Sequence, residues 1–125
     1  MNCGMVLMTS DNNCLIEVRF TPEFKRNLRA LGKKYRHIRS DIEPVIEQIR
    51  TGKIIGDKIP KTGDYTIFKV RIQNSDIHKG KRSGYRMICY VKSEKEIILI
   101  TIYSKTEQGD ITPKQIHQIL KEYFG

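Results

Sequence analysis

Tryptophan is absent from the 125 residues of this chain, and cysteine and histidine each occur only three times. Cys3, Cys14 and Cys89 form no CxxC pair and no set with histidine at the spacing of metal ligands. We therefore expect no metal site and no cofactor. An odd number of cysteines also indicates a reducing compartment, which predicts a cytoplasmic protein.

Acidic residues are scarce as well, because 14 Asp and Glu stand against 23 Lys and Arg, for a net charge of +9. His37, His78 and His117 each lie in a different expected element. Neither a catalytic histidine nor a carboxylate pair is indicated, so cations and tyrosines remain as the available chemical groups. Because the basic residues gather in particular segments, they favour a polyanionic partner, usually nucleic acid, over a role in solubility alone.

Long apolar runs are missing too. No run approaches the roughly 20 residues of a membrane span, and the opening residues MNCGMVLMTS lack the charged region of a signal peptide. We therefore expect no membrane partner. Residues 1–14 show no clear periodicity, which predicts a poorly structured N-terminal extension, and residues 15–125 have the length of a single domain.

Residues 66–105 are expected to form three strands. In the first, Lys69 and Arg71 alternate with apolar residues, and a period of two places these cations on one face of the strand. Arg86 occupies the equivalent position in the second strand. The third strand is apolar on both faces over residues 97–102, which predicts a buried and central position. The resulting sheet should carry exposed cations on one surface.

Helical periodicity predicts two helices before these strands. A half-buried edge strand at residues 15–20 leads into a first helix that Thr21 caps, that Pro22 opens and that ends near Gly32. The cations of both helices form a basic run, for which a solvated face is the simplest interpretation.

The second helix carries apolar residues from position 38 to position 49, and two starts fit the sequence. Either Ser40 caps the helix and Pro44 lies in its first turn, or the helix begins near Tyr35 and Pro44 kinks it.

Residues 52–64 are rich in glycine, lysine and proline and are expected to form a loop into the sheet. After the strands, Asp110 or Thr112 should cap a last helix that begins at Pro113 and either packs on the sheet or meets a partner. The predicted fold class is α+β. It consists of a small, largely antiparallel sheet, two N-terminal helices packed on one face and a C-terminal helix, in the order β-α-α-β-β-β-α.

A glycine-rich basic loop, HKGKRSG, joins the first two of the three strands. It lacks the spacing of a Walker phosphate-binding loop, so as a motif it is weak. Its cations Lys79, Lys81 and Arg82 are candidates for binding RNA through the phosphate backbone.

Taken together, the element order, the KVRI strand, the GKRSGYRMICYV segment and the ending ILITIYSKTEQGDIT resemble the RelE/ParE superfamily of bacterial toxins from type II toxin-antitoxin modules. The resemblance covers about residues 15–124. RelE-like members are small endonucleases that cut mRNA on the ribosome without a metal. The resemblance therefore implies mRNA and the ribosome as partners, together with a cognate antitoxin that covers the basic sheet with an acidic segment.

The resemblance also implies site residues. Lys69 and Arg71 match the two cations of the family's first long strand, and Arg86 matches the arginine of its Gly-Tyr-Arg motif. Lys105 stands where the family has a Lys-Arg pair, but Thr106 follows it, so the arginine is absent. No tyrosine occurs just beyond that position either.

Cutting RNA without a metal requires a base for the 2′-OH, cations for the phosphorane and an acid for the leaving 5′-oxygen. Lys69 is the candidate base, and repulsion from Arg71 and Arg86 would favour loss of its proton. The same arginines would hold the scissile phosphate, and Lys105 or Tyr103 would protonate the leaving group.

Two alternatives remain open. ParE-like relatives share this architecture but bind and poison DNA gyrase, and their sheets lack the full cationic set. A non-catalytic RNA-binding protein would also explain the charge of the sheet, although not the order of the elements.

Overall fold

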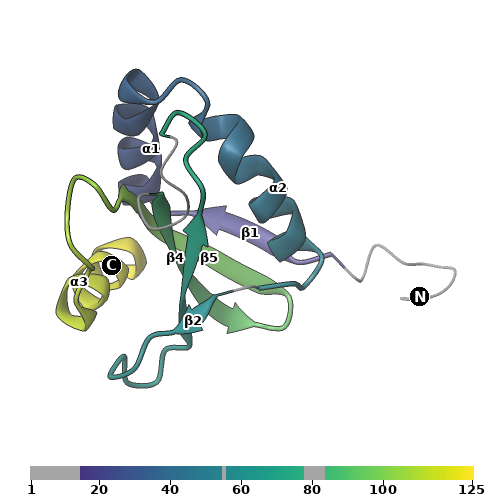
Figure 1. The fold of residues 1–125 in the computed structure, drawn as a ribbon. Coiled ribbons are helices and arrows are strands. Elements are labelled where there is room, and N and C mark those ends of the chain that lie inside the picture. The colour runs from purple at the N-terminus through teal and green to yellow at the C-terminus, as the bar shows by residue number, and fades with distance from the viewer. Residues whose placement is uncertain (1–14, 55, 78–83) are drawn as a thin grey trace, which may run out of the picture.

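The computed structural model describes residues 15–54, 56–77 and 84–125. In these residues the chain forms three helices and five strands in the order β1-α1-α2-β2-β3-β4-β5-α3 (Figure 1). The candidate RNA-binding residues Lys79, Lys81 and Arg82 lie outside the described residues. The division into an extension at residues 1–14 and a domain at residues 15–125 stays a prediction.

The five strands form one sheet in the order β1-β5-β4-β3-β2. The strand bounds are β1 Glu17–Phe20, β2 Asp57–Lys58, β3 Ile67–Ile72, β4 Tyr85–Ser93 and β5 Glu96–Ser104. β1 runs parallel to β5, whereas all the other neighbours are antiparallel. As expected from its apolar sequence, β5 is buried and interior, but the central strand of the sheet is β4 and not β5. As expected from its alternation, β1 is an edge.

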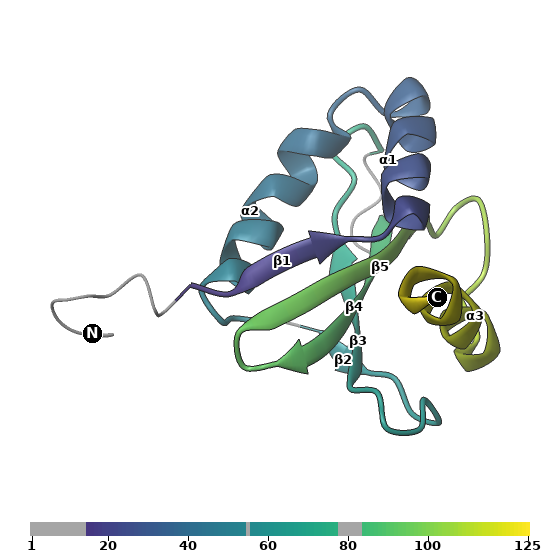
Figure 2. The same cartoon turned by 180° about the vertical axis from the view of Figure 1, so that it is seen from behind.

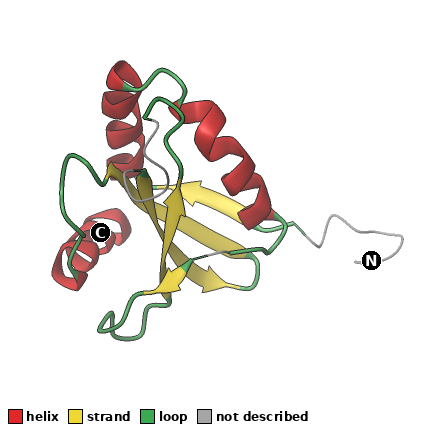
Figure 3. Ribbon diagram, in the orientation of Figure 1, coloured by secondary structure: helices red, strands yellow, loops and turns green. Residues whose placement is uncertain are grey.

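Helices cover both faces of this sheet (Figures 2 and 3). α1 (Pro22–Lys34) and α2 (Ile38–Arg50) pack on one face, and α3 (Pro113–Phe124) packs on the other. We call the second surface the α3 face. The two core clusters match the predicted alternation, because Val70 and Met87 belong to the core under α1 and α2, whereas Ile67 and Ile88 belong to the core under α3.

Thr21 begins α1 as the sequence predicts. Its hydroxyl oxygen accepts a hydrogen bond from the Phe24 backbone N–H at 3.0 Å and donates one to the Ile100 carbonyl of β5 at 2.6 Å. The predicted end near Gly32 is two residues too early, because the helix continues to Lys34. The N–H of Tyr35 then bonds to the Leu31 carbonyl at 2.7 Å and closes the last turn.

Neither predicted start of α2 is correct. The helix begins at Ile38 and includes Pro44, while the Ser40 hydroxyl donates to the His37 carbonyl instead of capping the helix. The backbone N–H of His37 donates to the Asp76 carboxylate at 3.0 Å, and the His37 ring contacts the same carboxylate at 2.7 Å. A carboxylate remote in sequence therefore marks the start of this helix, which no local pattern could indicate.

The segment expected to be a plain loop contains the short strand β2. Asp57 pairs with Lys69 and Lys58 pairs with Phe68, so the expectation of a loop throughout residues 52–64 is wrong at these two positions. A two-residue strand shows no periodicity, and its pairing with β3 depends on the tertiary fold. The observed order is thus the predicted one with one additional strand.

Thr112, and not Asp110, caps α3. Its side chain accepts from the Gln115 N–H at 3.2 Å, and its own N–H donates to the Gln115 side chain at 2.9 Å, which completes a capping box. Ile116 and Leu120 are fully buried against the sheet. Of the two predicted arrangements for this helix, packing on the sheet is the one observed.

Gly84 sits where β4 begins, directly before Tyr85, and its backbone lies against the end of β3. A Cβ at this position would lie 2.0 Å from the Ile72 carbonyl oxygen, far inside contact distance. The glycine of the Gly-Tyr-Arg segment is therefore required by a close approach of two backbones.

We predict that Gly84→Ala destabilises the protein by about 2–3 kcal/mol, because β3 and β4 must separate to admit the methyl group. Gly109→Ala is the matched control, since a Cβ there meets no atom within 4 Å. Chemical denaturation of both variants measures the difference. Equal stability of the two variants would contradict the close approach.

Candidate functional site

The predicted site residues of the strands lie in neighbouring rows on the α3 face. Arg71 of β3 is directly opposite Arg86 of β4, and Arg86 is opposite Tyr103 of β5. Lys69 lies one row away, opposite Ile88. The predicted alternation is confirmed, because residues directly opposite one another share a face of the sheet.

Arg86 is buried, with only 5% of its surface exposed, so the expectation of an exposed cation at this position is wrong. Its guanidinium donates to the Tyr85 carbonyl at 3.2 Å. The sequence suggested exposure because it did not show that β4 is the central strand of the sheet, with neighbours on both sides. Arg71 on the adjacent strand is exposed, and its guanidinium lies 3.4 Å from the Asp57 carboxylate.

Lys69 and Lys105 converge on a residue that the sequence did not suggest as part of the site. The Nζ atoms of both lysines approach the same oxygen of Asp110, at 3.6 Å for Lys69 and 2.9 Å for Lys105. The hydrogen bond from Lys105, followed by the nearby positive charge of Lys69, holds the pKa of the Asp110 carboxyl below its usual range.

Asp110 was missed because it lies just before α3, where an acidic residue is most simply interpreted as a helix cap. The sequence feature that could have indicated Asp110 is the short segment from Lys105 to Thr112. A segment of this length can fold back against the strand that precedes it and bring Asp110 close to Lys105. We call Lys69, Lys105 and Asp110 the lysine clamp.

Tyr103 lies next to the lysine clamp and is nearly fully buried. Its hydroxyl oxygen accepts a long hydrogen bond, 3.4 Å, from the Ile111 backbone N–H. Burial raises the pKa of Tyr103 above its ordinary value, and the Asp110 carboxylate raises it further, while the Ile111 N–H and the Arg86 charge act in the opposite direction. The phenol is therefore protonated at neutral pH and retains a proton to donate.

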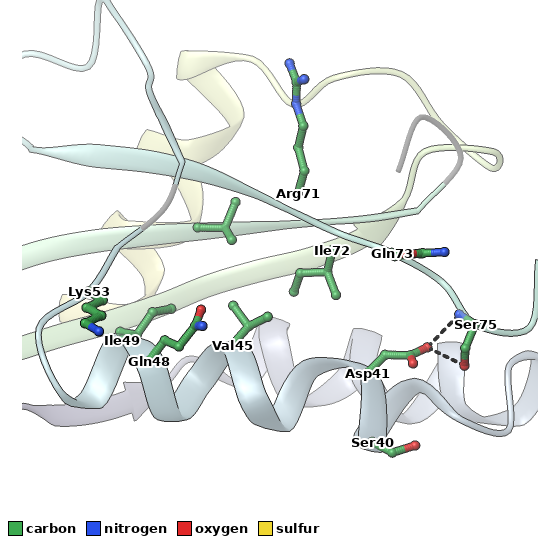
Figure 4. A pocket seen from close by; sticks show the side chains of 11 residues that line it. Ser40, Asp41, Val45, Gln48, Ile49, Lys53, Arg71, Ile72, Gln73 and Ser75 are labelled. Atoms are coloured by element: carbon green, nitrogen blue, oxygen red, sulfur yellow. Dashed lines mark hydrogen bonds between the residues drawn. The ribbon is translucent and has the colours of Figure 1, made fainter. Parts of the chain in front are cut away.

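A hollow on the opposite side of the sheet is a separate feature. A cavity of about 570 Å³ lies between α2 and β3 (Figure 4). The Asp41 carboxylate at its end accepts bonds from the backbone N–H and the hydroxyl of Ser75, at 3.0 and 3.1 Å. Arg71 contributes to the lining but points away from the other side chains in Figure 4. The cavity therefore does not contain the predicted chemistry.

Other groups of the described chain are not arranged for catalysis. Cys89 is buried on the α1 and α2 side of the sheet, as its apolar strand predicts, and burial raises the pKa of its thiol to about 12. Among the residues that the structure describes, no three His, Cys, Asp or Glu side chains lie together as a metal site. Within the same residues, every helix is too short or too polar to cross a bilayer.

Comparisons with known proteins include a structural likeness. No protein-family model matches the chain. Among solved structures, the chain is similar to a double arginine-to-alanine mutant of the E. coli toxin RelE in the free state, with 16% sequence identity. The alignment covers 88% of this chain and 95% of that one, with a TM-score of 0.48. No residue role is transferred from this likeness.

The two opposed arginines differ in burial, and this difference predicts different effects on stability. Arg86→Ala should reduce the free energy of unfolding by about 1–3 kcal/mol, because it removes buried side-chain packing and a hydrogen bond. Arg71→Ala, at the exposed partner position, should change it by less than about 0.5 kcal/mol. Thermal or chemical denaturation tests this order, and a neutral Arg86→Ala would contradict the burial.

Removing the charge of Asp110 should release the two lysines. We predict that Asp110→Asn increases affinity for inorganic polyphosphate by about two- to fivefold, since partly exposed ion pairs of this kind compete weakly with a second anion. Glu43→Gln is the matched control, because it removes an exposed carboxylate from α2 on the other side of the sheet. Titration at low and high salt measures both variants, and an equal gain in both would show a simple effect of net charge.

Proposed function

We propose that this chain is the toxin of a type II toxin-antitoxin module and that it cuts mRNA on the ribosome without a metal. The observation that carries the proposal is the lysine clamp. One lysine of β3 and one in the turn after β5 converge on one carboxylate oxygen beside a protonated tyrosine and a buried arginine. An oxygen of a backbone phosphate has the charge and the size to take the place of that carboxylate oxygen.

The chemistry follows from the positions of these groups. When a phosphate replaces Asp110, Lys69 lies beside it on β3 and is the candidate base that takes the proton of the 2′-OH. Arg86 and Arg71 stabilise the charge that develops on the phosphorane. Tyr103, which the structure keeps protonated, donates the proton to the leaving 5′-oxygen, with Lys105 as the other candidate acid.

The partners follow from the resemblance of the sequence. A cognate antitoxin would cover the α3 face or displace α3, and the many exposed cations of α1 and α2 would add a salt-sensitive attraction to RNA or to the antitoxin. The location consistent with these partners is the cytoplasm.

One observation favours a second function. Carboxylates lie next to three of the cations of the α3 face: Lys69, Lys105 and Arg71. The fourth cation, Arg86, is buried. The α3 face therefore presents less free positive charge than the sequence suggests. The arginine that the nuclease family has after Lys105 is also absent. A ParE-like toxin that binds DNA gyrase, or a protein that binds RNA without cutting it, needs fewer free cations on the sheet.

One experiment separates these functions. The chain is induced in cells, mRNA 5′ ends are mapped, and gyrase supercoiling is assayed in parallel. New 5′ ends at codon boundaries with unchanged supercoiling are expected. Lost supercoiling without new 5′ ends would favour the gyrase-directed function.

Lys69→Arg tests the chemical step itself. The substitution keeps the charge but presents a group that does not lose its proton near neutral pH, so RNA affinity should persist while cleavage falls by about 100-fold or more. Lys58→Arg is the matched control, because Lys58 is an exposed lysine of the neighbouring strand β2. Cleavage of mRNA on pre-formed ribosome complexes measures both variants.

Two outcomes would change the assignment. If Lys69→Arg cleaves at the rate of the unchanged protein, the base lies elsewhere, with Lys81 and Lys105 as the next candidates. If EDTA abolishes cleavage by pre-formed complexes, the metal-free mechanism is wrong.

A further inference from the structure

A second cluster on the α3 face consists of aromatic rings. The Tyr65 and Tyr90 rings are 5.0 Å apart, the Tyr90 and Phe124 rings 6.4 Å, and the Tyr123 and Phe124 rings 5.1 Å, each measured between centroids. The planes of these pairs meet at 88°, 90° and 69°, so the rings contact one another edge to face. We call Tyr65, Tyr90, Tyr123 and Phe124 the aromatic platform.

The aromatic platform is open to solvent, unlike the rings of the core. Phe124 is 47% exposed, and the three tyrosines are half-buried. Tyr35 and Tyr85, which also meet edge to face, are buried between the sheet and the helices. Tyr65 and Tyr90 also pack against the core under α3. Because an exposed phenylalanine ring gains little free energy from its position, the stability of the core does not explain the placement of Phe124.

Cations border the platform. The Lys92 Nζ atom lies 5.4 Å from the centroid of the Phe124 ring. Arg19 of β1 lies on the same side as Tyr123 and shares the Glu96 carboxylate with Lys92, at 2.7 Å for Arg19 and 3.8 Å for Lys92. Glu17 also contacts Arg19, at 3.3 Å, so two carboxylates face these two cations, and the Lys92 ammonium is the cation that lies against the exposed ring.

α3 connects the platform with the lysine clamp. The helix begins three residues after Asp110, and Ile111 just before it contacts Tyr103, whereas Phe124 at its C-terminal end contacts Tyr90. A helix of this length extends for roughly 18 Å. One extended strand of nucleic acid could follow the helix and reach both ends of the α3 face.

We propose that the aromatic platform binds the bases of single-stranded RNA by stacking, at the other end of α3 from the site where the lysine clamp holds the phosphate to be cut. The proposal rests on the proposed function, since it takes RNA as the substrate. Aromatic rings next to Lys or Arg are the combination that binds single strands without sequence preference, because every base has a flat face and every nucleotide a phosphate. The platform thus supplies affinity for the strand that flanks the cut.

The absence of tryptophan from the chain permits a direct test. Phe124→Trp places a single fluorescent indole in the platform, and Gln48→Trp places one at an exposed position of α2 on the other side of the sheet as the control. The probe is a 2′-O-methyl RNA of about ten nucleotides, which has no free 2′-OH and is not cut. Inorganic polyphosphate serves as the ligand without bases.

The oligonucleotide should quench the emission of Phe124→Trp, whereas polyphosphate should not, and Gln48→Trp should respond to neither. Phe124→Leu should lower affinity for the oligonucleotide by about 5- to 100-fold, and Phe124→Tyr should preserve it. Equal quenching by polyphosphate, or equal affinity of the Leu and Tyr variants, would overturn the proposal. Circular dichroism of each variant confirms that the fold is kept.

The test is independent of the cleavage assay. Quenching by the oligonucleotide together with a failure to cut mRNA would retain the aromatic platform and reject the nuclease. Cleavage of mRNA without quenching would reject the platform and retain the nuclease.

Discussion

The pairing of β3 with β4 is the constraint on which the rest of the α3 face depends. Gly84 allows the two backbones to meet at the Ile72 carbonyl, and this contact sets the register that brings Arg71, Arg86 and Tyr103 into one row. A shift of β3 by one residue would turn Arg71 to the other face of the sheet, away from Arg86 and Tyr103. Both the positions of the site residues and the packing of the α3 face therefore depend on the backbone geometry of the β3–β4 pair.

Much of this arrangement follows from local sequence patterns. A period of two assigns Lys69 and Arg86 to the same face, and the apolar residues of β5 place that strand inside the sheet, because each pattern reflects contacts within one strand or with its immediate neighbours. The start of α2, the strand β2 and the position of Asp110 could not be predicted, since each depends on contacts between residues far apart in the sequence or on the path of a loop.

The charges of the site also depend on contacts that local sequence patterns do not reveal. The composition indicates a large positive excess, and alternation places cations on one face, but neither reveals that carboxylates lie beside them. Asp110 and Asp57 both come from irregular or marginal segments and neutralise cations that the regular strands present. The burial of Arg86 likewise depends on the strands at both sides of β4 and not on the residues around it in the sequence.

The two outer strands have a consequence for the solution behaviour of the protein. β1 has four residues and β2 has two, and both carry charged side chains, whereas the interior strand β5 has nine residues that are almost all buried. A sheet with such an apolar interior would readily join another sheet if its edges were long and apolar. Short, charged edge strands instead offer few positions where a second sheet can pair. The sheet can therefore have an apolar interior without promoting fibrous aggregation through its edges.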